Sequence, residues 1–378
     1  MKSGWERTGL RDLAIIETGK WDANHAVEGG AYRFYTCAAD FMFCNTKRFS
    51  GNCLVFPGNG ANVGEVYFYN GEFDAYQRTY VLHSISKRLL PRLLYYHFLS
   101  NWKSVGTAKQ YGSATNFIKI GNFNDYFVSF PSSLPEQQRI VDVLDQEFAK
   151  IDALKANAEK SLQAAKDLFS SALSSELRHR AGWKETKIGD FCEIIRGKRF
   201  VRADMVEEGV PCIHYGDIYT HYGLYATKAK GCVSPDLAKK LRFAHKNDVI
   251  VVAAGENRLD IGVGVAWLGD EPAVVHDACF ILKHSQNPMF LSFYFRSAEY
   301  HQYLKDEVNE GKICSFLTKP LAEARISLPP LLEQEQIVKR LIIVSNNCTT
   351  LQENYQKTLS LCDDLKQALL RKAFNGEL

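Results

Sequence analysis

Two long stretches of the chain carry the hydrophobic spacing of a single, unusually long helix. Hydrophobic residues recur about every 3.6 positions from Ile140 to Ala172 and from Ile337 to Ala373, with no proline inside either stretch. Each helix would span about 40 residues, or roughly 60 Å. A lone amphipathic helix of that length cannot bury its apolar stripe, so we expect the two to pair as an antiparallel coiled coil. The side chains expected to pack this pair are Ile140, Leu144, Ile151, Leu154, Leu162, Leu341, Val344, Leu351, Leu359 and Leu365.

The segments in front of these helices have a different pattern, rich in aromatic residues and short strand-like runs. Residues 65–69, followed by the pair Asn70-Gly71, predict a strand and a turn, and residues 248–252 predict a buried strand. Residues 91–102 and 288–303 predict helices with a proline in the first turn. These mixed segments indicate a globular head in front of each long helix.

Both halves of the chain carry the same short sequences in the same order. The first matches are 178 residues apart and the later ones 197 to 201 apart, which places an insertion at about residues 219–247 of the second copy. Several ordered matches at nearly constant spacing indicate a tandem duplication. The matching positions are Gly4-Trp5 with Gly182-Trp183, Gly19-Lys20 with Gly197-Lys198, Tyr80-Val81-Leu82 with Phe280-Ile281-Leu282, Pro91 with Pro288, Glu136-Gln137 with Glu333-Gln334, and Glu176-Leu177 with Glu377-Leu378.

The repeat and the two patterns together predict an α+β fold. We expect two similar mixed α/β heads joined by two long antiparallel spacer helices that form a coiled coil. The predicted boundaries are 1–130 for the first head, 131–178 for the first spacer helix, 179–326 for the second head and 327–378 for the second spacer helix.

The composition is that of an ordinary folded protein, with 46% hydrophobic and 24% charged residues. No apolar run approaches the ~18 residues of a membrane span and no signal peptide opens the chain, so we expect no membrane association and a cytoplasmic location. Ten cysteines without a C-x-x-C pair predict free thiols and no metal site. The net charge of +3 is small, but the positive excess lies in the two heads, where a phosphate-binding surface would need it.

Basic and amide side chains gather in predicted loops of both heads. Asn59 and Asn62 lie on a glycine-rich turn before a strand, and Asn257 and Arg258 hold the equivalent place in the second copy. Such side chains suit contacts with DNA phosphates and base edges, although a solvated face is the more common role of charged clusters. The candidate DNA-binding residues are Lys20, Lys47, Arg48, Asn59, Asn62, Lys198, Arg199, Arg202, Lys228, Lys230, Lys239, Lys240, Asn257 and Arg258.

An alternative is a DNA-modifying enzyme, a methyltransferase or a nuclease, with a duplicated DNA-binding region. Asn287-Pro288-Met289-Phe290 is similar to the Asn-Pro-Pro-aromatic motif of adenine methyltransferases, but it lacks the second proline. In addition, Pro288 aligns with Pro91, which has no asparagine before it. The repeat therefore favours a plain helix start at this place.

Two other groups of residues could belong to a catalytic site. Pro235-Asp236 and Glu310-Gly311-Lys312 could be pieces of a metal-dependent nuclease site, but the first copy has neither. His276-Asp277 could be a catalytic pair, but it aligns with Tyr76-Gln77. We expect a hydrogen-bonding or core role for His276 and Asp277.

Several motifs together resemble one known family, the specificity subunits (HsdS) of type I restriction-modification systems. The resemblance covers the whole chain in the order head, helix, head, helix, and the corners that lead into the helices are its most specific part. The first head departs from the family pattern at residues 31–34, which lack the proline of residues 210–213. The resembling segments are Gly209–Ile213, Gly216–Ile218, Leu134–Val141, Leu328–Val338 and Ala373–Leu378.

The resemblance implies a non-catalytic subunit that reads double-stranded DNA. Each head would read one half of a bipartite, asymmetric site. The helix pair would set the distance between the halves, about one turn of B-DNA or roughly 34 Å. Two modification (methyltransferase) subunits would dock on the helix pair, and restriction (translocase/nuclease) subunits would join the complex. The chain itself would hold no cofactor, whereas S-adenosylmethionine, magnesium and ATP would belong to the partner subunits.

Overall fold

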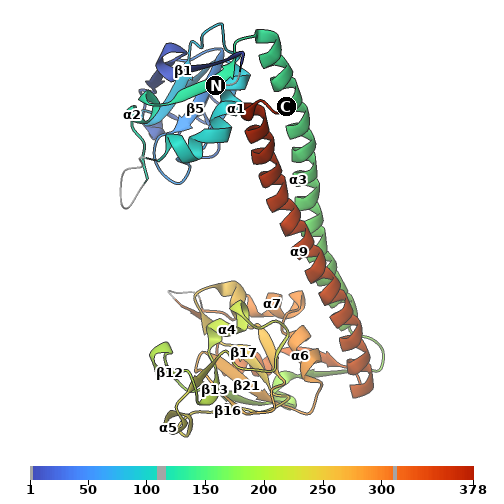
Figure 1. Ribbon diagram of the computed structural model, residues 1–378. Coiled ribbons are helices and arrows are strands. Elements are labelled where there is room, and N and C mark those ends of the chain that lie inside the picture. The colour runs from blue at the N-terminus through green and yellow to red at the C-terminus, as the bar shows by residue number, and fades with distance from the viewer. Residues whose placement is uncertain (1–2, 109–115, 310–312) are drawn as a thin grey trace. The chain divides into compact units, whose positions relative to one another are not determined.

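The computed structural model describes residues 3–108, 116–309 and 313–378, which fold into two compact units (Figure 1). The first unit comprises residues 1–159 and 356–378, and the second comprises residues 160–355. Each unit therefore contains one head, the beginning of one long helix and the end of the other.

The head of the first unit is built on two small sheets. One has the strand order β2-β8-β5-β6 and the other the order β4-β3-β7, while β1 and β9 form a separate pair. Helix α1 packs on the first sheet through Leu93, Leu94 and Phe98, which are fully buried. The elements are β1 (Trp5–Gly9), β2 (Ile15–Thr18), β3 (Tyr32–Tyr35), β4 (Met42–Cys44), β5 (Asn52–Pro57), β6 (Tyr67–Asn70), β7 (Phe73–Ala75), β8 (Thr79–His83), α1 (Pro91–Asn101), α2 (Gly121–Asn124) and β9 (Phe127–Pro131).

The head of the second unit repeats this plan with additional strands at the sheet edges. Its two larger sheets have the orders β11-β21-β17-β19-β14 and β12-β15-β13-β20-β16, and β10-β23 and β18-β22 form pairs. The elements are β10 (Lys184–Lys187), β11 (Glu193–Arg196), β12 (Met205–Val206), β13 (Val210–Ile213), α4 (Tyr215–Thr220), β14 (Tyr225–Ala226), β15 (Gly231–Val233), α5 (Pro235–Ala238), β16 (Phe243–Ala244), β17 (Val249–Val252), β18 (Ala254–Gly255), β19 (Gly264–Trp267), β20 (Ala273–Val275), β21 (Cys279–Lys283), α6 (Pro288–Tyr294), α7 (Ala298–Leu304), β22 (Cys314–Ser315), α8 (Thr318–Glu323) and β23 (Arg325–Leu328).

The predicted duplication is confirmed at the level of strand register. Ile16 lies opposite Leu82 across β2 and β8, and the matching residues Ile194 and Leu282 lie opposite each other across β11 and β21. Strands β3 and β13 each pair in parallel with the strand that precedes the last long strand, so the missing proline in the first head changes no pairing. The edge strands β14 and β16 fall within the predicted insertion at 219–247.

One predicted helix is interrupted. Residues 288–303 form two helices, α6 and α7, and not one. The hydroxyl of Ser297 accepts a hydrogen bond from the backbone N–H of Tyr300 at 3.2 Å, so a new helix starts there. The proline that begins α6 predicted its start correctly, but the internal cap was missed.

Two glycines of the repeat hold the first strand close to the loop before the last long strand. A Cβ atom on Gly19 would lie 1.7 Å from the carbonyl oxygen of Ala75, and one on Gly197 would lie 2.1 Å from that of His276. No side chain fits in such a space, which explains the glycine in both copies. The backbone just before β8 therefore packs directly against Gly19, and the backbone just before β21 packs directly against Gly197.

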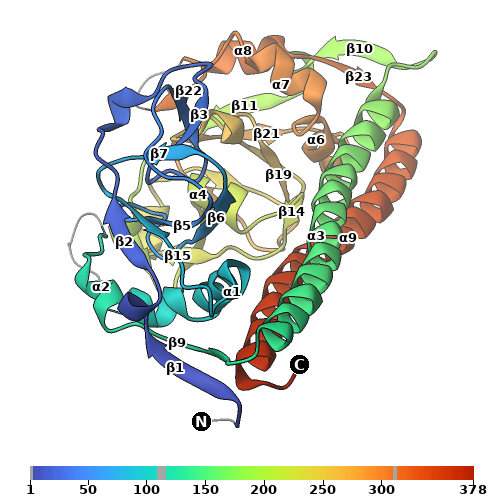
Figure 2. The same cartoon turned by 90° about the horizontal axis from the view of Figure 1, so that it is seen from above.

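The two long helices, α3 (Leu134–Leu177) and α9 (Leu331–Asn375), pack antiparallel within each unit, as predicted (Figures 1 and 2). In the first unit the end of α9 joins the core of the head through Leu370 and Ala373. In the second unit the end of α3 does the same through Leu173. Each head is therefore completed by the helix of the other repeat.

The contact between the helices follows a spacing of 3.5 residues and not 3.6. Leu144, Ile151, Ala158 and Ala165 lie seven residues apart and are all buried. Among the other residues predicted to pack the pair, Ile140 and Leu341 are buried, while Leu162, Val344 and Leu359 are half-buried.

The prediction was wrong for three leucines, since Leu154, Leu351 and Leu365 are 54%, 38% and 48% exposed. A 3.5-residue spacing alternates steps of four and three residues, so the sequence 144, 148, 151 continues to position 155 and not to position 154. Lys155 occupies that position, with 34% of its side chain exposed.

Two ion pairs fix the register of the helices in the first unit. Lys155 Nζ lies 2.8 Å from Asp363 Oδ1, and Lys366 pairs with Asp152 in the opposite sense. Lysines at seam positions lower stability compared with leucine, but they favour one register. The crossed pairs also place residues 152–155 at the level of residues 363–366.

A buried glutamine at the start of each long helix joins the helix to its head. Gln137 is fully buried; its Oε1 accepts a hydrogen bond from the backbone N–H of Leu90, and its Nε2 donates to the carbonyls of Arg88 and Pro131, all at 2.8 Å. Gln334 is placed in the same way, accepting from the N–H of Asn287 at 2.9 Å. The repeated Glu-Gln sequence is therefore a clamp between the long helix and the helix start in the head.

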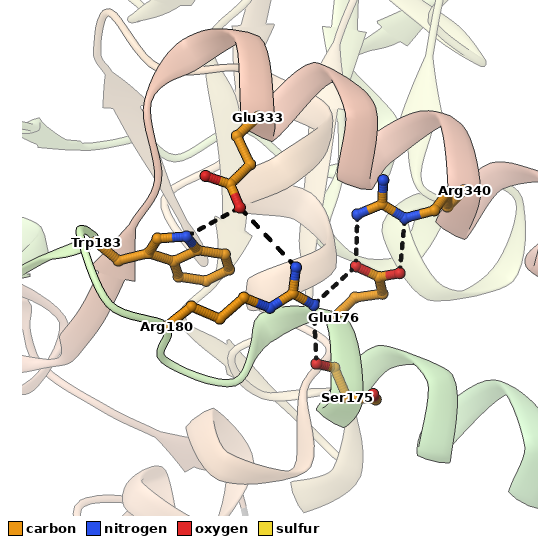
Figure 3. A network of polar contacts seen from close by, with 6 residues as sticks. All are labelled: Ser175, Glu176, Arg180, Trp183, Glu333 and Arg340. Carbon is orange, nitrogen blue, oxygen red and sulfur yellow. Dashed lines mark hydrogen bonds and ion pairs between the residues drawn. The ribbon is translucent and has the colours of Figure 1, made fainter.

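A polar network ties the end of α3 to the start of α9 in the second unit (Figure 3). The carboxylate of Glu176 accepts hydrogen bonds from Nε and Nη2 of Arg340 at 2.7 and 2.8 Å, and from Arg180 at 3.2 Å. These partners, Arg340 first, lower the pKa of Glu176. Glu333, next to the clamping glutamine, accepts a hydrogen bond from the indole N–H of Trp183 at 3.1 Å.

The 3.5-residue seam predicts opposite effects for two neighbouring positions of α3. Ile151→Asp buries an unpaired charge and should lower the free energy of unfolding by on the order of 3 kcal/mol. Leu154→Asp, the matched control on the exposed flank, should change it by about 0.5 kcal/mol or less. Urea unfolding of the purified chain measures both, and equal destabilisation by the two variants would contradict the seam.

The clamp predicts a similar contrast between two adjacent glutamines. Gln137→Ala leaves one N–H and two carbonyl groups without a partner, and each such buried group costs about 1–3 kcal/mol. Gln138→Ala removes only an exposed contact with Asp142 and serves as the control. Thermal unfolding should show a large decrease in melting temperature for the first variant only. If Gln137→Ala melts like the wild type, the clamp does not hold the helix.

Candidate nucleic-acid interface

Several of the predicted DNA-binding cations already have acidic partners. Lys47 lies 2.6 Å from Glu72, which raises the pKa of the lysine, and Arg48 lies 2.5 Å from Glu17. Both pairs are partly or fully solvent-exposed, so they are weak and could open for a phosphate group.

Three predicted residues have structural hydrogen bonds. Asn62 Nδ2 donates to the carbonyl of Cys37 at 2.8 Å, which ties down the glycine-rich turn. Asn257 caps a short helix by accepting from the N–H of Leu259 at 3.1 Å, and Arg258 donates to the carbonyl of Lys305. These side chains shape the loops.

The remaining predicted lysines lie on the surface of the heads. Lys239 is paired with Asp236 at 2.9 Å on the first turn of α5. These remaining lysines, all exposed, are Lys20, Lys198, Lys228, Lys230, Lys239 and Lys240. None of them lines either of the two head cavities described next.

Asn59 lies in a cavity of about 330 Å³ in the first head. Strand β5 ends at this cavity, and the residues just before β8 form its opposite wall, with Gln77 and Arg78 exposed at its surface. The other lining residues are Gly58, Tyr80, Phe117 and Ile118. The lining therefore combines amide and guanidinium groups with aromatic rings.

Arg199 and Arg202 lie at a larger cavity, of about 530 Å³, in the second head. Arg196, Asp277 and Glu256 line it as well, so charged groups of both signs lie among its apolar lining residues. Arg196 donates through Nε to the carbonyl of Asp277 at 2.9 Å. Both guanidinium groups of the predicted residues belong to exposed side chains.

Two histidines packed against each other form one wall of this second cavity. The rings of His214 and His276 are 4.5 Å apart, and burial lowers the pKa of both. The Nδ1 atom of His214 accepts from the N–H of Gly216 at 3.3 Å, and that of His276 accepts from the N–H of Ala278 at 3.0 Å. The Nδ1 atom of His276 also lies 3.1 Å from Oδ1 of Asp277.

Of the residues that line these cavities, Asn59, Arg199 and Arg202 were predicted to bind DNA, whereas Gln77, Arg78 and Asp277 were not. They come from separate segments and become neighbours only in the folded head. The signal that could have found them is the divergence of Tyr76-Gln77-Arg78 from His276-Asp277-Ala278 between two matching stretches of the repeat.

The motifs of the alternative enzyme have other roles where the structure describes them. Asn287 is the N-cap of α6, with Oδ1 accepting from the N–H groups of Met289 and Phe290 at 3.0 and 3.1 Å. Asp236 pairs with Lys239 on α5. Residues 310–312 lie outside the described residues. Over the described ranges, no group of three or more His, Cys, Asp or Glu side chains is placed to hold a metal ion, and no helix is long and apolar enough to cross a membrane.

The chain is similar to several known proteins. It is 25% identical to the EcoDI type I restriction enzyme specificity subunit of Escherichia coli, over 99% of this chain and 88% of that protein. It is 23% identical to the EcoBI specificity subunit of the same species, over 75% of this chain and 65% of that protein.

Two solved structures show the same fold. A chain from a study of complex assembly and conformational transition in a type I restriction-modification system has a TM-score of 0.76 at 18% identity, covering 100% of this chain and 99% of that one. The HsdS subunit from Thermoanaerobacter tengcongensis has a TM-score of 0.55 at 17% identity, covering 100% of this chain and 98% of that one.

The domain family described as "Type I restriction modification DNA specificity domain" matches residues 2–164 of the chain and, a second time, residues 180–361. The two matches fall on the two repeats and cover most of the chain. This confirms the family that the sequence motifs indicated: the chain belongs to the type I restriction-modification DNA specificity family.

Proposed function

We propose that the chain is the DNA-recognition subunit of a type I restriction-modification complex and reads a bipartite, asymmetric site. One observation carries this: a DNA specificity domain occurs twice in one chain, each time with its own complete head. Two heads of one fold imply two half-sites. Their differently lined cavities imply that the half-sites differ in sequence.

The partners of the chain are DNA, methyltransferase subunits and restriction subunits. We infer that the catalytic chemistry belongs to these partners, with S-adenosylmethionine, magnesium and ATP bound there and no cofactor bound by this chain. The relatives are named as specificity subunits of restriction enzymes, which supports this division of roles.

The exposed leucines of the long helices are the proposed docking face for the modification subunits. Leu154 and Leu365 lie at the same level of the helix pair in the first unit, because the ion pairs on either side of them align 152–155 with 363–366. Leu168 and Leu351, also exposed, belong to the second unit. One such set in each unit fits the proposed binding of two modification subunits.

The docking proposal predicts loss of assembly without loss of folding. Leu154→Asp combined with Leu365→Asp should abolish co-purification with the modification subunits, because charges replace an apolar contact. The melting temperature of the chain alone should stay unchanged. Asn157→Asp, which adds a charge at another exposed position of α3, is the control and should assemble normally. Normal assembly of the double variant would refute this docking face.

The bipartite site is tested by the methylation pattern of DNA. When the chain is co-expressed with its modification subunits in a host without adenine methylation, long-read sequencing should show one split motif with unread bases in the middle. Four residues inserted beside Ala158 lengthen α3 by about 6 Å and should lengthen the preferred spacer, leaving both half-sites unchanged.

Exchange of residues 1–130 for the head of another family member is the complementary arm of this experiment. It should change one half-site only and leave the spacer unchanged. If the insertion alters the half-site bases and keeps the spacer, the helices do not set the distance. A single continuous methylated motif would refute the division of reading between two heads.

A further inference from the structure

The two cavities described above lie at the same topological position in the two heads. In the first head the backbone N–H of Ile118 donates to the carbonyl of Gly58 at 2.9 Å, just after β5 ends. In the second head the N–H of Phe316 donates to the carbonyl of Ala253 at 3.0 Å, just after β17 ends. Strands β5 and β17 are equivalent in the repeat, so both cavities open between the same returning segment and the same strand end.

The opposite walls of the cavities are equivalent as well. They consist of the residues just before β8 and just before β21, which are separated by 200 positions in the sequence. The isolated bridge between Asn59 and Phe117 corresponds to the pairing of Ala254 with Ser315. A cavity kept through duplication while its lining changed has the properties of a binding site whose specificity has diverged.

We propose that these two cavities are the base-reading sites of the heads, with Gln77 and Arg78 reading the first half-site and Asp277 reading the second. The inference rests on the DNA-recognition function proposed above. It names the part of each head that distinguishes one DNA sequence from another.

In the first head the backbone at Tyr76 and Gln77 is held by hydrogen bonds, while the side chains of Gln77 and Arg78 are free. The N–H of Gln77 donates to the carbonyl of Trp21 at 2.8 Å, and the N–H of Tyr76 donates to that of Tyr35 at 2.9 Å. The side chains of Gln77 and Arg78 are exposed and have no hydrogen-bond or ionic partner within the part of the chain that the structure describes. Recognition of a base requires a side chain whose donors and acceptors are not already bonded within the protein. It also requires a backbone that holds this side chain in place before DNA binds.

The chemistry of these side chains fits base edges in the major groove. Glutamine forms a bidentate pair with adenine, arginine forms one with guanine, and a carboxylate accepts from the amino group of cytosine. In the second head Asp277, at the place of Gln77, has 40% of its side chain exposed, and its Oδ1 lies 3.1 Å from Nδ1 of His276. Arg199 and Arg202, exposed beside it, carry the positive charge that brings a phosphate backbone close.

The test measures base preference in the complex with the modification subunits. The wild type and the variants Gln77→Ala, Arg78→Ala and Asp277→Ala methylate a set of duplexes in which every base pair of both half-sites is changed in turn. The first two variants should lose discrimination at one base pair of the first half-site, by roughly ten- to hundredfold, and keep the second half-site unchanged. Asp277→Ala should lose discrimination at one base pair of the second half-site and keep the first half-site unchanged. Lys87→Ala, an exposed cation of the first head away from the cavity, is the control and should behave as the wild type.

A variant that prefers a different base distinguishes the loss of a base contact from a folding defect, since a misfolded head would prefer no base. Gln77→Glu replaces the amide with a carboxylate and should move the preference at its base pair from adenine toward cytosine. Uniform weakening over all duplexes would show contact with phosphate only and would overturn the assignment, as would unchanged preference at every base pair. If the wild-type complex itself methylates no bipartite motif, the proposed function fails and not the location of the reading site.

Discussion

The buried amide groups of Gln137 and Gln334 hold the long helices to the heads, and the arrangement of each unit depends on them. In the first repeat a single side chain satisfies one backbone N–H and two carbonyl groups in a fully buried corner. An amide suits this corner because it offers two N–H donors and an acceptor oxygen, whereas a carboxylate has no N–H and leucine has neither group. The same corner starts helix α1 or α6 in the head, so head and long helix are positioned by one contact.

In the helix pair, one set of residues provides the stability and another set determines the register. Its stability comes from buried seam residues such as Leu144 and Ile151, whereas partly exposed ion pairs contribute about 0–1 kcal/mol each. The crossed pairs Lys155–Asp363 and Lys366–Asp152 instead penalise any shifted register, which would leave seam lysines without partners. With lysines on the seam, the neighbouring leucines of the pattern face outward. An exposed apolar flank on both helices is therefore a direct consequence of how the register is specified.

Features encoded by local spacing could be predicted from the sequence. The duplication, the two long helices and the strands before them all follow from short-range patterns, and the register of β2 with β8 and of β11 with β21 confirms the repeat. The seam was predicted less well, because a reading based on hydrophobicity prefers Leu154 to Lys155, whereas the seam of a supercoiled pair passes through residue 155.

The cavities could not be predicted, because hydrogen bonds between distant segments assemble them. Charge alone was also a poor guide: Lys47 and Arg48 are basic loop residues, but each lies beside an acidic side chain. Gln77 is uncharged and has no local sequence signal. Its difference from Asp277 in the repeat gains a meaning when the fold shows that Gln77 and Asn59 line the same cavity.

The two cavities also show how one fold can read different sequences at little cost in stability. Main-chain hydrogen bonds and the close approach at Gly19 or Gly197 fix the backbone, and neither depends on the identity of the cavity side chains. Substitutions at exposed positions usually change stability by about 0.5 kcal/mol or less, so Gln77 is free to vary. Asp277 is half-buried, and a substitution there removes one side-chain contact, with Nδ1 of His276 at 3.1 Å. His276 is different, since its Nδ1 accepts from the N–H of Ala278 and its ring packs against that of His214. In the second head the position that can change specificity without disturbing the loop is therefore 277 and not 276.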